Sequence, residues 1–239
     1  MDRQNNTPGL VNWVGYLAIA LLLTLPVAVL TVRSGAWQQG LLMYTLSCLG
    51  AATLLALSVV LLLLPRFTRW RKGIAGRALI TLPGTLLLLS VLASRGDYPP
   101  IHDITTDTRE PPVFTAAEQR RGPGANTLEV DADAIALQQK TYPDLQTILS
   151  EMTIEEAFDR ALQVATDMGW DVYHQDLNAG VIEAVDTTAI MAFKDDVVIR
   201  VRSNAQGTLL DLRSVSRVGI GDIGANAKRI RAFRQRFGQ

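Results

Sequence analysis

The chain has 239 residues, 48% of them hydrophobic, with 23 acidic and 23 basic side chains and a formal net charge of zero. These values fit one or two compact units, and the balance of charge argues against a nucleic-acid partner, which would need an excess of basic residues. The one cysteine, Cys48, lies in an apolar run, so the later part of the chain cannot form an internal disulfide.

Three long apolar runs follow a short polar tail. The first begins at Trp13, contains no charged residue and is long enough to cross a hydrocarbon core of about 30 Å. It lacks a small-residue cleavage site and two more runs follow it, so we do not expect a cleaved signal peptide. Arg77 and Arg95 flank the shorter third run, and their long side chains can extend the span. The predicted segments are the tail 1–12 and, within 13–94, transmembrane helices at about 13–32, 40–64 and 78–93.

The three runs contain no Asp, Glu, Lys, Arg or His of the kind that a transport pathway would require, so we interpret them as an anchor in a lipid bilayer. Basic residues between the runs predict its orientation. The link between the second and third runs is strongly basic, whereas the link between the first two carries only Arg33. Positive links stay in the cytosol, which predicts a cytoplasmic N-terminus and an exported segment after Ser94. In a Gram-negative cell, this would be a multi-pass inner-membrane protein with a periplasmic domain. The cations of the basic link are Arg66, Arg69, Arg71, Lys72 and Arg77.

Residues 95–125 are rich in proline and glycine and show neither helical nor strand periodicity, so we expect an extended connector. The exported domain would then cover 126–239. A short strand at 127–131 and a helical turn or two at 133–140 are further expectations.

From Thr153 onward the sequence predicts an α+β fold. Thr153 and Glu156 have the spacing of a capping box, and apolar residues then recur on one helical face until Gly169. Alternating segments predict two β-hairpins, and the last segment predicts an amphipathic helix from about residue 223 to 237. The predicted domain is therefore a four-stranded antiparallel sheet packed with two main helices, in the order helix, four strands, helix.

The second predicted hairpin places charged side chains on one face of the sheet. Its turn sets Arg200 opposite Asp211, and the alternation puts Arg202 and Arg213 on the same face. A face of this kind is typical of the solvated outer side of a sheet. It is also a candidate binding surface.

The stretch GIGDIG places Gly219, Gly221 and Gly224 at the spacing of a dinucleotide-binding turn. We expect no dinucleotide and no other cofactor, because no further strand or acidic residue follows and the preceding strands are predicted to form hairpins. The glycines are better explained by a sharp turn from strand to helix, with Asp222 as the N-cap. Asn226, on the apolar face of the helix, should hydrogen-bond to this turn.

An alternative for the same turn is anion binding. The helix N-terminus, with Arg213 and Arg217 nearby, could hold a phosphate or carboxylate group. Against this stands the simpler interpretation of a structural cap, with both arginines in local ion pairs.

Other catalytic and metal-binding patterns are missing from the sequence. The two histidines, His102 and His174, show no ligand spacing with nearby carboxylates, so no metal site is predicted. No G-x-S-x-G segment is present, which argues against a serine hydrolase. Asp195 and Asp196 are adjacent on a strand and should point to opposite faces, so they cannot act as an acid–base pair.

Three segments of the sequence resemble one known family. They are IHDITTD (101–107), KDDVVIRV (194–201) and DLRSVSRVGIGDIGANAKRI (211–230). They look like the domain of unknown function 1499 family, whose members combine such a domain with membrane spans or a lipid anchor. The resemblance covers about residues 99–237, supports the domain boundary and implies no activity.

The leading hypothesis is a noncatalytic binding or assembly module of the cell envelope with an envelope protein or polymer as its partner. One alternative is an envelope enzyme, in which carboxylates and a histidine of the connector meet the arginines of the sheet. A second is binding of anionic lipid or phosphate groups by the glycine-rich turn and the basic last helix. The candidate binding residues are Arg200, Arg202, Asp211, Arg213, Arg217, Gly219, Gly221, Gly224, Asn226, His102, Asp103 and Asp107.

Overall fold

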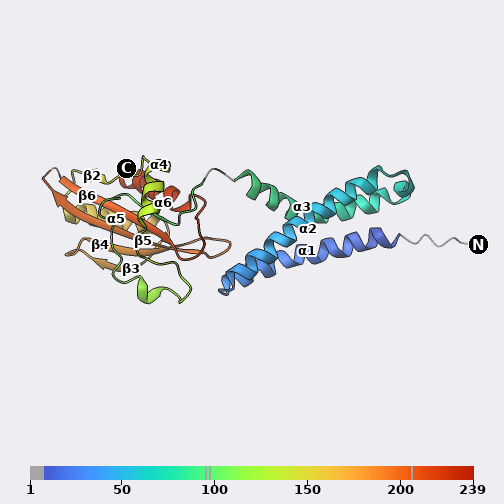
Figure 1. Cartoon of the computed structure of the whole chain (residues 1–239), viewed down its shortest axis with the longest axis horizontal. Helices are drawn as coiled ribbons and strands as arrows, with labels where there is room; N and C mark the ends of the chain where they lie inside the picture. The colour runs from blue at the N-terminus through green and yellow to red at the C-terminus, as the bar shows by residue number, and fades with distance from the viewer. Residues whose placement is uncertain (1–7, 95, 97, 206) are drawn as a thin grey trace, which may run out of the picture. The chain divides into compact units, whose positions relative to one another are not determined.

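The computed structural model describes residues 8–94, 96, 98–205 and 207–239. The chain divides into two compact units, Met1–Gly96 and Asp97–Gln239. Figure 1 shows the first unit as a group of helices and the second as a sheet with helices packed on it. The start of the predicted tail, residues 1–7, lies outside the described residues.

The first unit contains three helices, and each is long and apolar enough to cross a membrane. α3 begins before the apolar run, because its basic first turns also form helical hydrogen bonds. Arg77 in these turns donates to the Gly73 carbonyl at 3.0 Å and to Asn12 Oδ1 at 2.9 Å. The helices are α1 (Gly9–Arg33), α2 (Trp37–Leu63) and α3 (Arg71–Ala93), with the 3-10 helix η1 (Pro65–Trp70) before α3.

Small residues allow these helices to pack closely. A Cβ atom on Gly84 of α3 would lie 2.8 Å from the Ala51 Cβ atom of α2, and one on Gly15 of α1 would lie 2.8 Å from Arg77 Nε. The Ala51 Cβ atom is fixed to the backbone of α2, so Gly84 sets the approach of α2 and α3, whereas Gly15 leaves space for the Arg77 side chain. Pro26 and Pro83 lie inside α1 and α3.

The second unit has an antiparallel sheet of six strands in the order β1-β6-β5-β4-β3, with β2 also paired to β6. The prediction of mixed helix and antiparallel sheet is confirmed, but the predicted count of four strands is wrong. β1 and β2 are only three residues long, too short to show a periodic pattern, and both pair with the outer edge of β6. The strands are β1 (Asp103–Thr105), β2 (Ile148–Ser150), β3 (Asp171–Asp176), β4 (Val181–Thr187), β5 (Lys194–Asn204) and β6 (Gly207–Ser216).

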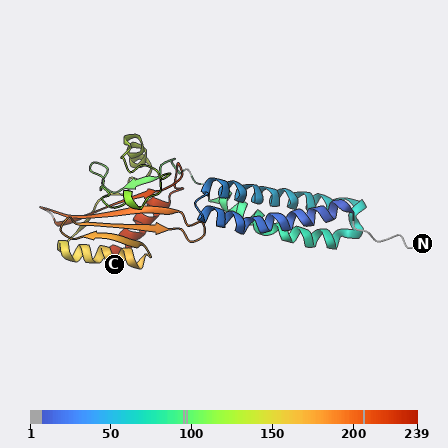
Figure 2. The same ribbon diagram turned by 90° about the horizontal axis from the view of Figure 1, so that it is seen from below.

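Two helices, α5 (Ile154–Asp167) and α6 (Ala225–Phe237), cover one face of this sheet (Figure 2). The predicted capping box forms at Thr153 and Glu156. Trp170 stacks on Phe233 of α6, with ring centroids 5.7 Å apart, inside the main apolar core. The hydrophobic stripes of both helices are therefore buried against the strands, as amphipathic helices require.

The segment before α5 differs from its prediction. Residues 127–131 form no strand, because the Leu128 carbonyl accepts a hydrogen bond from the Arg213 side chain at 2.8 Å rather than from a neighbouring strand. A helix, α4 (Ala132–Thr141), does form close to where a helical turn was expected. The expectation of an extended connector at 95–125 is also wrong for its described part, which contains β1 and the 3-10 helix η2 (Glu118–Arg120). Polar groups of the connector bond to charged side chains of the sheet, and these bonds hold the connector against the sheet.

Candidate functional site

The register of β5 and β6 sets the geometry of the candidate residues. Arg200 pairs with Asp211 across the two strands, as the sequence predicts. Asp195 and Asp196 point to opposite faces, since Asp195 forms an ion pair with Arg229 of α6 and Asp196 forms one with Arg121 of the connector. The two adjacent carboxylates therefore belong to two separate networks.

We call the sheet face opposite α5 and α6 the charged face. Its central side chains are Glu183, Asp196, Arg200, Arg202, Asp211 and Arg213. The interpretation of this face as solvated is wrong. Asp211 is 0% exposed and Arg213 is 2% exposed, because the connector covers them and bonds to both. A small apolar cluster that includes Phe114 and Ala117 of the connector and Val198 and Val215 of the sheet fixes this cover.

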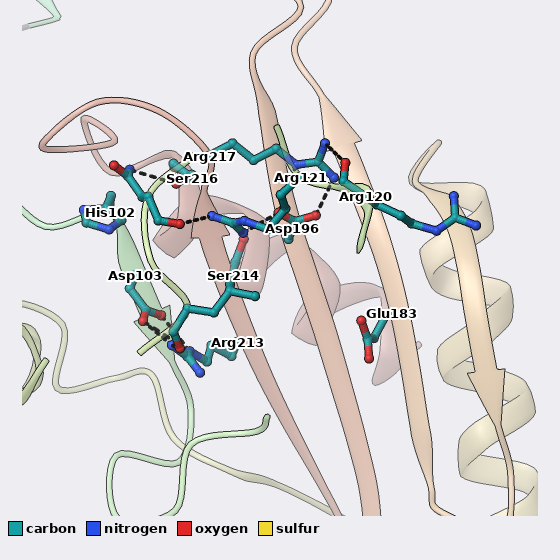
Figure 3. A network of polar contacts seen from close by, with 12 residues as sticks. His102, Asp103, Arg120, Arg121, Glu183, Asp196, Arg213, Ser214, Ser216 and Arg217 are labelled. Carbon is teal, nitrogen blue, oxygen red and sulfur yellow. Dashed lines mark hydrogen bonds and ion pairs between the residues drawn. The ribbon is translucent and has the colours of Figure 1, made fainter. Parts of the chain in front are cut away.

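Asp196 lies between two guanidinium groups, those of Arg121 and Arg217 (Figure 3). Arg217 Nη2 is 2.7 Å from Asp196 Oδ1, and Arg121 Nη1 contacts the other carboxylate oxygen. Burial lowers the pKa of the Arg121 guanidinium, and the charge of Asp196 opposes that shift. Without Asp196, both guanidinium groups would be buried with no counter-charge, so this carboxylate stabilises the contact between the two arginines.

Asp103 and Arg213 form a second ion pair on the charged face. Arg213 Nη2 is 2.6 Å from Asp103 Oδ2, and Arg213 Nε is 3.0 Å from Asp103 Oδ1. The remaining guanidinium N–H groups donate to the carbonyls of Pro112 and Leu128. This two-point geometry fixes the direction of the carboxylate and connects β1 to β6.

Asp107 and Asp211 share the guanidinium groups of Arg200 and Arg202. Arg200 Nη2 lies 2.9 Å from a carboxylate oxygen of each aspartate, and Arg202 Nη2 lies 3.0 Å from Asp107 and 3.1 Å from Asp211. Burial raises the pKa of the Asp107 carboxyl, but the N–H groups of Glu110 and Arg109 and the two arginines outweigh it, and the pKa is lowered overall. The carboxylates of the connector and the arginines of the sheet therefore do meet, and each of these carboxylates already forms an ion pair within the chain.

Glu183 of β4 is a buried acid of the charged face that was not among the candidates. Its carboxylate accepts hydrogen bonds from the N–H groups of Thr115 and Ala116 and from the Tyr173 hydroxyl. Burial and this neighbouring carboxylate raise the pKa of Tyr173. The alternation of residues 181–187 places Glu183 on this face, so the pattern contained the signal for it.

Asn226 lies on the other side of the sheet, in a buried polar group beneath α6. Its Oδ1 accepts from Ser214 Oγ at 2.7 Å and from Arg229, while its Nδ2 donates to Ser216 Oγ and to the His102 carbonyl. The expected hydrogen bond between this side chain and the glycine-rich turn is therefore wrong. The side chain instead joins α6 to β6, because it is oriented toward the strand.

The glycine-rich turn is held by hydrogen bonds between its own residues and the start of α6. Gly219 and Gly224 adopt φ values of +95° and +75°, which favour glycine. The helix begins at Ala225 with Gly224 as its N-cap, two residues later than predicted. Asp222 still caps it, because its carboxylate accepts from the N–H groups of Gly224 at 2.8 Å and Asn226 at 2.6 Å. The N–H groups of Gly224 and Asn226 are thus occupied by this carboxylate and are not available to an external anion.

A pocket of about 250 Å³ lies between the start of the connector and α4. His102 and Asp103 line it together with three exposed carboxylates and an apolar wall. The Asp103 carboxylate is held by Arg213, and His102 Nδ1 is 3.4 Å from the Ile220 carbonyl. The lining residues are Pro100, Ile101, His102, Asp103, Thr127, Glu129, Asp131, Asp133, Ala134 and Leu137.

Within the described ranges, no group of three or more His, Cys, Asp or Glu side chains is arranged to hold a metal ion. The family model described as "Protein of unknown function (DUF1499)" matches residues 103–237, so the chain belongs to this family. The match begins at β1, which places the folded connector inside the family's domain. A search of the curated proteins found no match to the chain.

Proposed function

We propose that this protein is a noncatalytic binding module of the cell envelope, anchored by α1–α3, with its C-terminal domain outside the cytosol. In a Gram-negative cell, the anchor would lie in the inner membrane and the domain in the periplasm. The observation that carries the proposal is the pocket beside α4, where exposed carboxylates surround an apolar wall. The basic link between α2 and α3 supports the orientation.

The charged face is better suited to stability than to catalysis. Its aspartates bind arginines of the same chain, and Glu183 binds backbone N–H groups and hydroxyls. A general acid or base must exchange a proton with a substrate that reaches it, whereas Asp196 and Glu183 are buried beneath the connector. The glycine-rich turn supplies its own anion, Asp222. These features favour binding at another surface.

The pocket indicates the chemistry of its partner. Ile101 and Leu137 provide an apolar wall, and the carboxylates of Glu129, Asp131 and Asp133 surround it. An apolar side chain flanked by lysine or arginine complements this arrangement, since it buries hydrocarbon and brings cations next to the acids. We therefore propose a basic segment of another envelope protein as the occupant.

Photo-crosslinking in intact cells tests this interface. A photoreactive residue at position 134, in the pocket wall, should capture one defined protein, and the same residue at the exposed Glu155 of α5 should not. Combining Glu129→Gln with Asp133→Asn should weaken the capture, because both changes remove a charge without touching the Asp131 cap of α4. Equal capture at both positions, or capture of lipid alone, would refute the proposal.

Reporter fusions test the orientation separately. An alkaline phosphatase joined after Gln239 should be active, because it folds only outside the cytosol, and a green fluorescent protein exported in unfolded form should stay dark. The reverse result would place the domain in the cytosol. It would overturn the envelope proposal whatever the pocket binds.

A further inference from the structure

We propose that one end of the C-terminal sheet inserts isoleucine side chains into the headgroup region of the bilayer that α3 crosses. The inserting residues, here called the apolar tip, are Ile220 and Ile223 of the glycine-rich turn and Ile190 of the β4–β5 loop. The inference requires that α3 spans a membrane. It does not depend on the pocket or on which side of the membrane the domain occupies.

The members of the apolar tip come from two loops at the same end of the sheet. β5 starts beside the end of β6, where Asp195 pairs with Ser216 and the Arg217 N–H donates to the Lys194 carbonyl at 3.0 Å. Ile220 is 81% exposed, Ile190 68% and Ile223 63%. Isoleucine at such exposure gains little from the domain's own core, and several at one end form an exposed apolar surface of the kind that marks interaction sites.

Ile223 is not only exposed but also has a strained backbone conformation. Its φ is +54°, in the left-handed region that β-branched residues rarely adopt and that asparagine or glycine adopts at lower cost. The exposure of its side chain means that packing within the domain does not offset this cost. An apolar environment outside the domain would offset it and would explain why the turn presents isoleucine.

The length of the chain identifies that environment. α3 ends at Ala93, and Tyr98, five residues further on, packs against the glycine-rich turn. A Cβ atom on Gly224 would lie 2.6 Å from Tyr98 Cε1, and the Asp222 N–H donates to the Ile101 carbonyl at 3.2 Å. Five residues span at most about 18 Å when fully extended. Tyr98 can therefore lie no further than that from the end of α3, and the turn that packs on the Tyr98 ring is linked to α3 by this short segment.

The residues around the tip have the composition of a membrane interface. The exposed Lys228 lies with its Nζ 5.9 Å from the centroid of the Tyr98 ring, and Lys194 is also exposed. Tyrosine and lysine next to aliphatic side chains are typical of segments that sit at headgroup level, where the cations meet lipid phosphates. The negative charge of Asp222 is directed at backbone N–H groups of its own turn. The occupant that fits is thus a lipid surface.

Site-specific fluorescence in the full chain tests this contact. The protein, carrying Cys48→Ala, is reconstituted in vesicles of phosphatidylethanolamine and phosphatidylglycerol, with a polarity-sensitive dye on Ile220→Cys. Leu177→Cys is the matched control, because Leu177 is an exposed aliphatic residue in the β3–β4 turn at the opposite end of the sheet. We expect headgroup-labelled quencher lipids to quench the dye at 220 and aqueous iodide to quench it at 177.

Either of two quenching results at position 220 would overturn the proposal. Iodide quenching at 220 as strong as at 177 would show a tip in water. Protection at 220 from both iodide and the quencher lipids would show a protein surface instead. A second variant, Ile223→Asn, separates insertion from folding, since it should reduce lipid quenching at 220 while the melting temperature of the chain in detergent stays the same or rises. A fall in melting temperature with unchanged lipid quenching would assign Ile223 a structural role and contradict the inference.

Discussion

The two faces of the C-terminal sheet are both buried, but they are stabilised by different interactions. On one face, Ile199 and Leu212 pack beneath α5 and α6 in an apolar core. On the other, the alternate residues of the same strands, Arg200, Asp211 and Arg213, bond to the connector. A strand with charged residues on one side is therefore no proof of a wet surface. The cover can come from a segment more than a hundred residues away in the sequence, as Asp103 and Arg213 show.

Mutations on the two faces should also affect the stability of the domain in different ways. Apolar burial contributes stability roughly in proportion to area, about 25 cal/mol per Å². Buried ion pairs contribute little net stability, because desolvation offsets their attraction, but the loss of one partner leaves a buried charge uncompensated. The charged face is thus expected to be the more sensitive to single truncations and to pH.

The largest effect should come from the charged face. Asp196→Ala leaves Arg121 and Arg217 near each other without their counter-charge and should lower the free energy of unfolding by about 3–5 kcal/mol. Thermal unfolding of the full chain in detergent, followed by near-UV circular dichroism, measures it. The control is Asp159→Ala, an exposed acid on α5, which should change little. Similar small effects of both changes would mean that the charged face does not hold the connector.

A somewhat smaller effect is expected from the helix-covered face. Leu212→Ala should cost about 3 kcal/mol, because it opens a cavity in the core beneath α5 and α6. The same unfolding experiment at several pH values gives the distinguishing measurement. The cost of Leu212→Ala should be constant across neutral and mildly acidic pH, since no titrating group is removed. A strong dependence on pH would show that the two faces are coupled.

The smallest effect should be that of Asp107→Asn, about 1 kcal/mol at neutral pH, because its arginine partners are partly exposed. The pKa of this carboxyl is lowered from its ordinary value of 3.8. Its contribution is therefore present above that value and is lost as the pH falls through the lowered one. Acid titration of unfolding should show the variant and the parent chain converging at the acidic end. A difference that persists in strong acid would contradict the assignment.

The sequence was sufficient to predict the long helices and strands, but it did not predict that the connector packs on the charged face of the sheet. Alternation and the Thr153–Glu156 capping box predicted α5, α6 and the four long strands, because these signals are local. β1 and β2 gave no signal, since three residues form no period. Prolines and glycines made the connector resemble a linker, whereas its fold depends on side chains of β5 and β6. Burial of the charged face is a tertiary property that no local pattern contains.

Part of the candidate site followed from register and part did not. Pairing of Arg200 with Asp211 could be predicted from the hairpin turn. Glu183 could also have been found, because it shares a face with these residues. Arg229 was missed, although it lies one helical turn after Asn226 on the same side of α6 and bonds to it. A buried arginine is unexpected on a helix with so many basic residues, and only its partner Asp195 explains it.

The edges of the sheet bear on how these molecules behave when crowded. β1, the Thr106 N–H and β2 together pair along the outer side of β6 and leave β3 as the open edge. The pairing of β3 with β4 is irregular between Val172 and His174, a distortion that makes an edge strand a poor template for another chain. Proteins confined to a bilayer collide in two dimensions and at high local density. A sheet with one paired edge and one irregular edge offers few backbone groups for the edge-to-edge pairing that leads to aggregation.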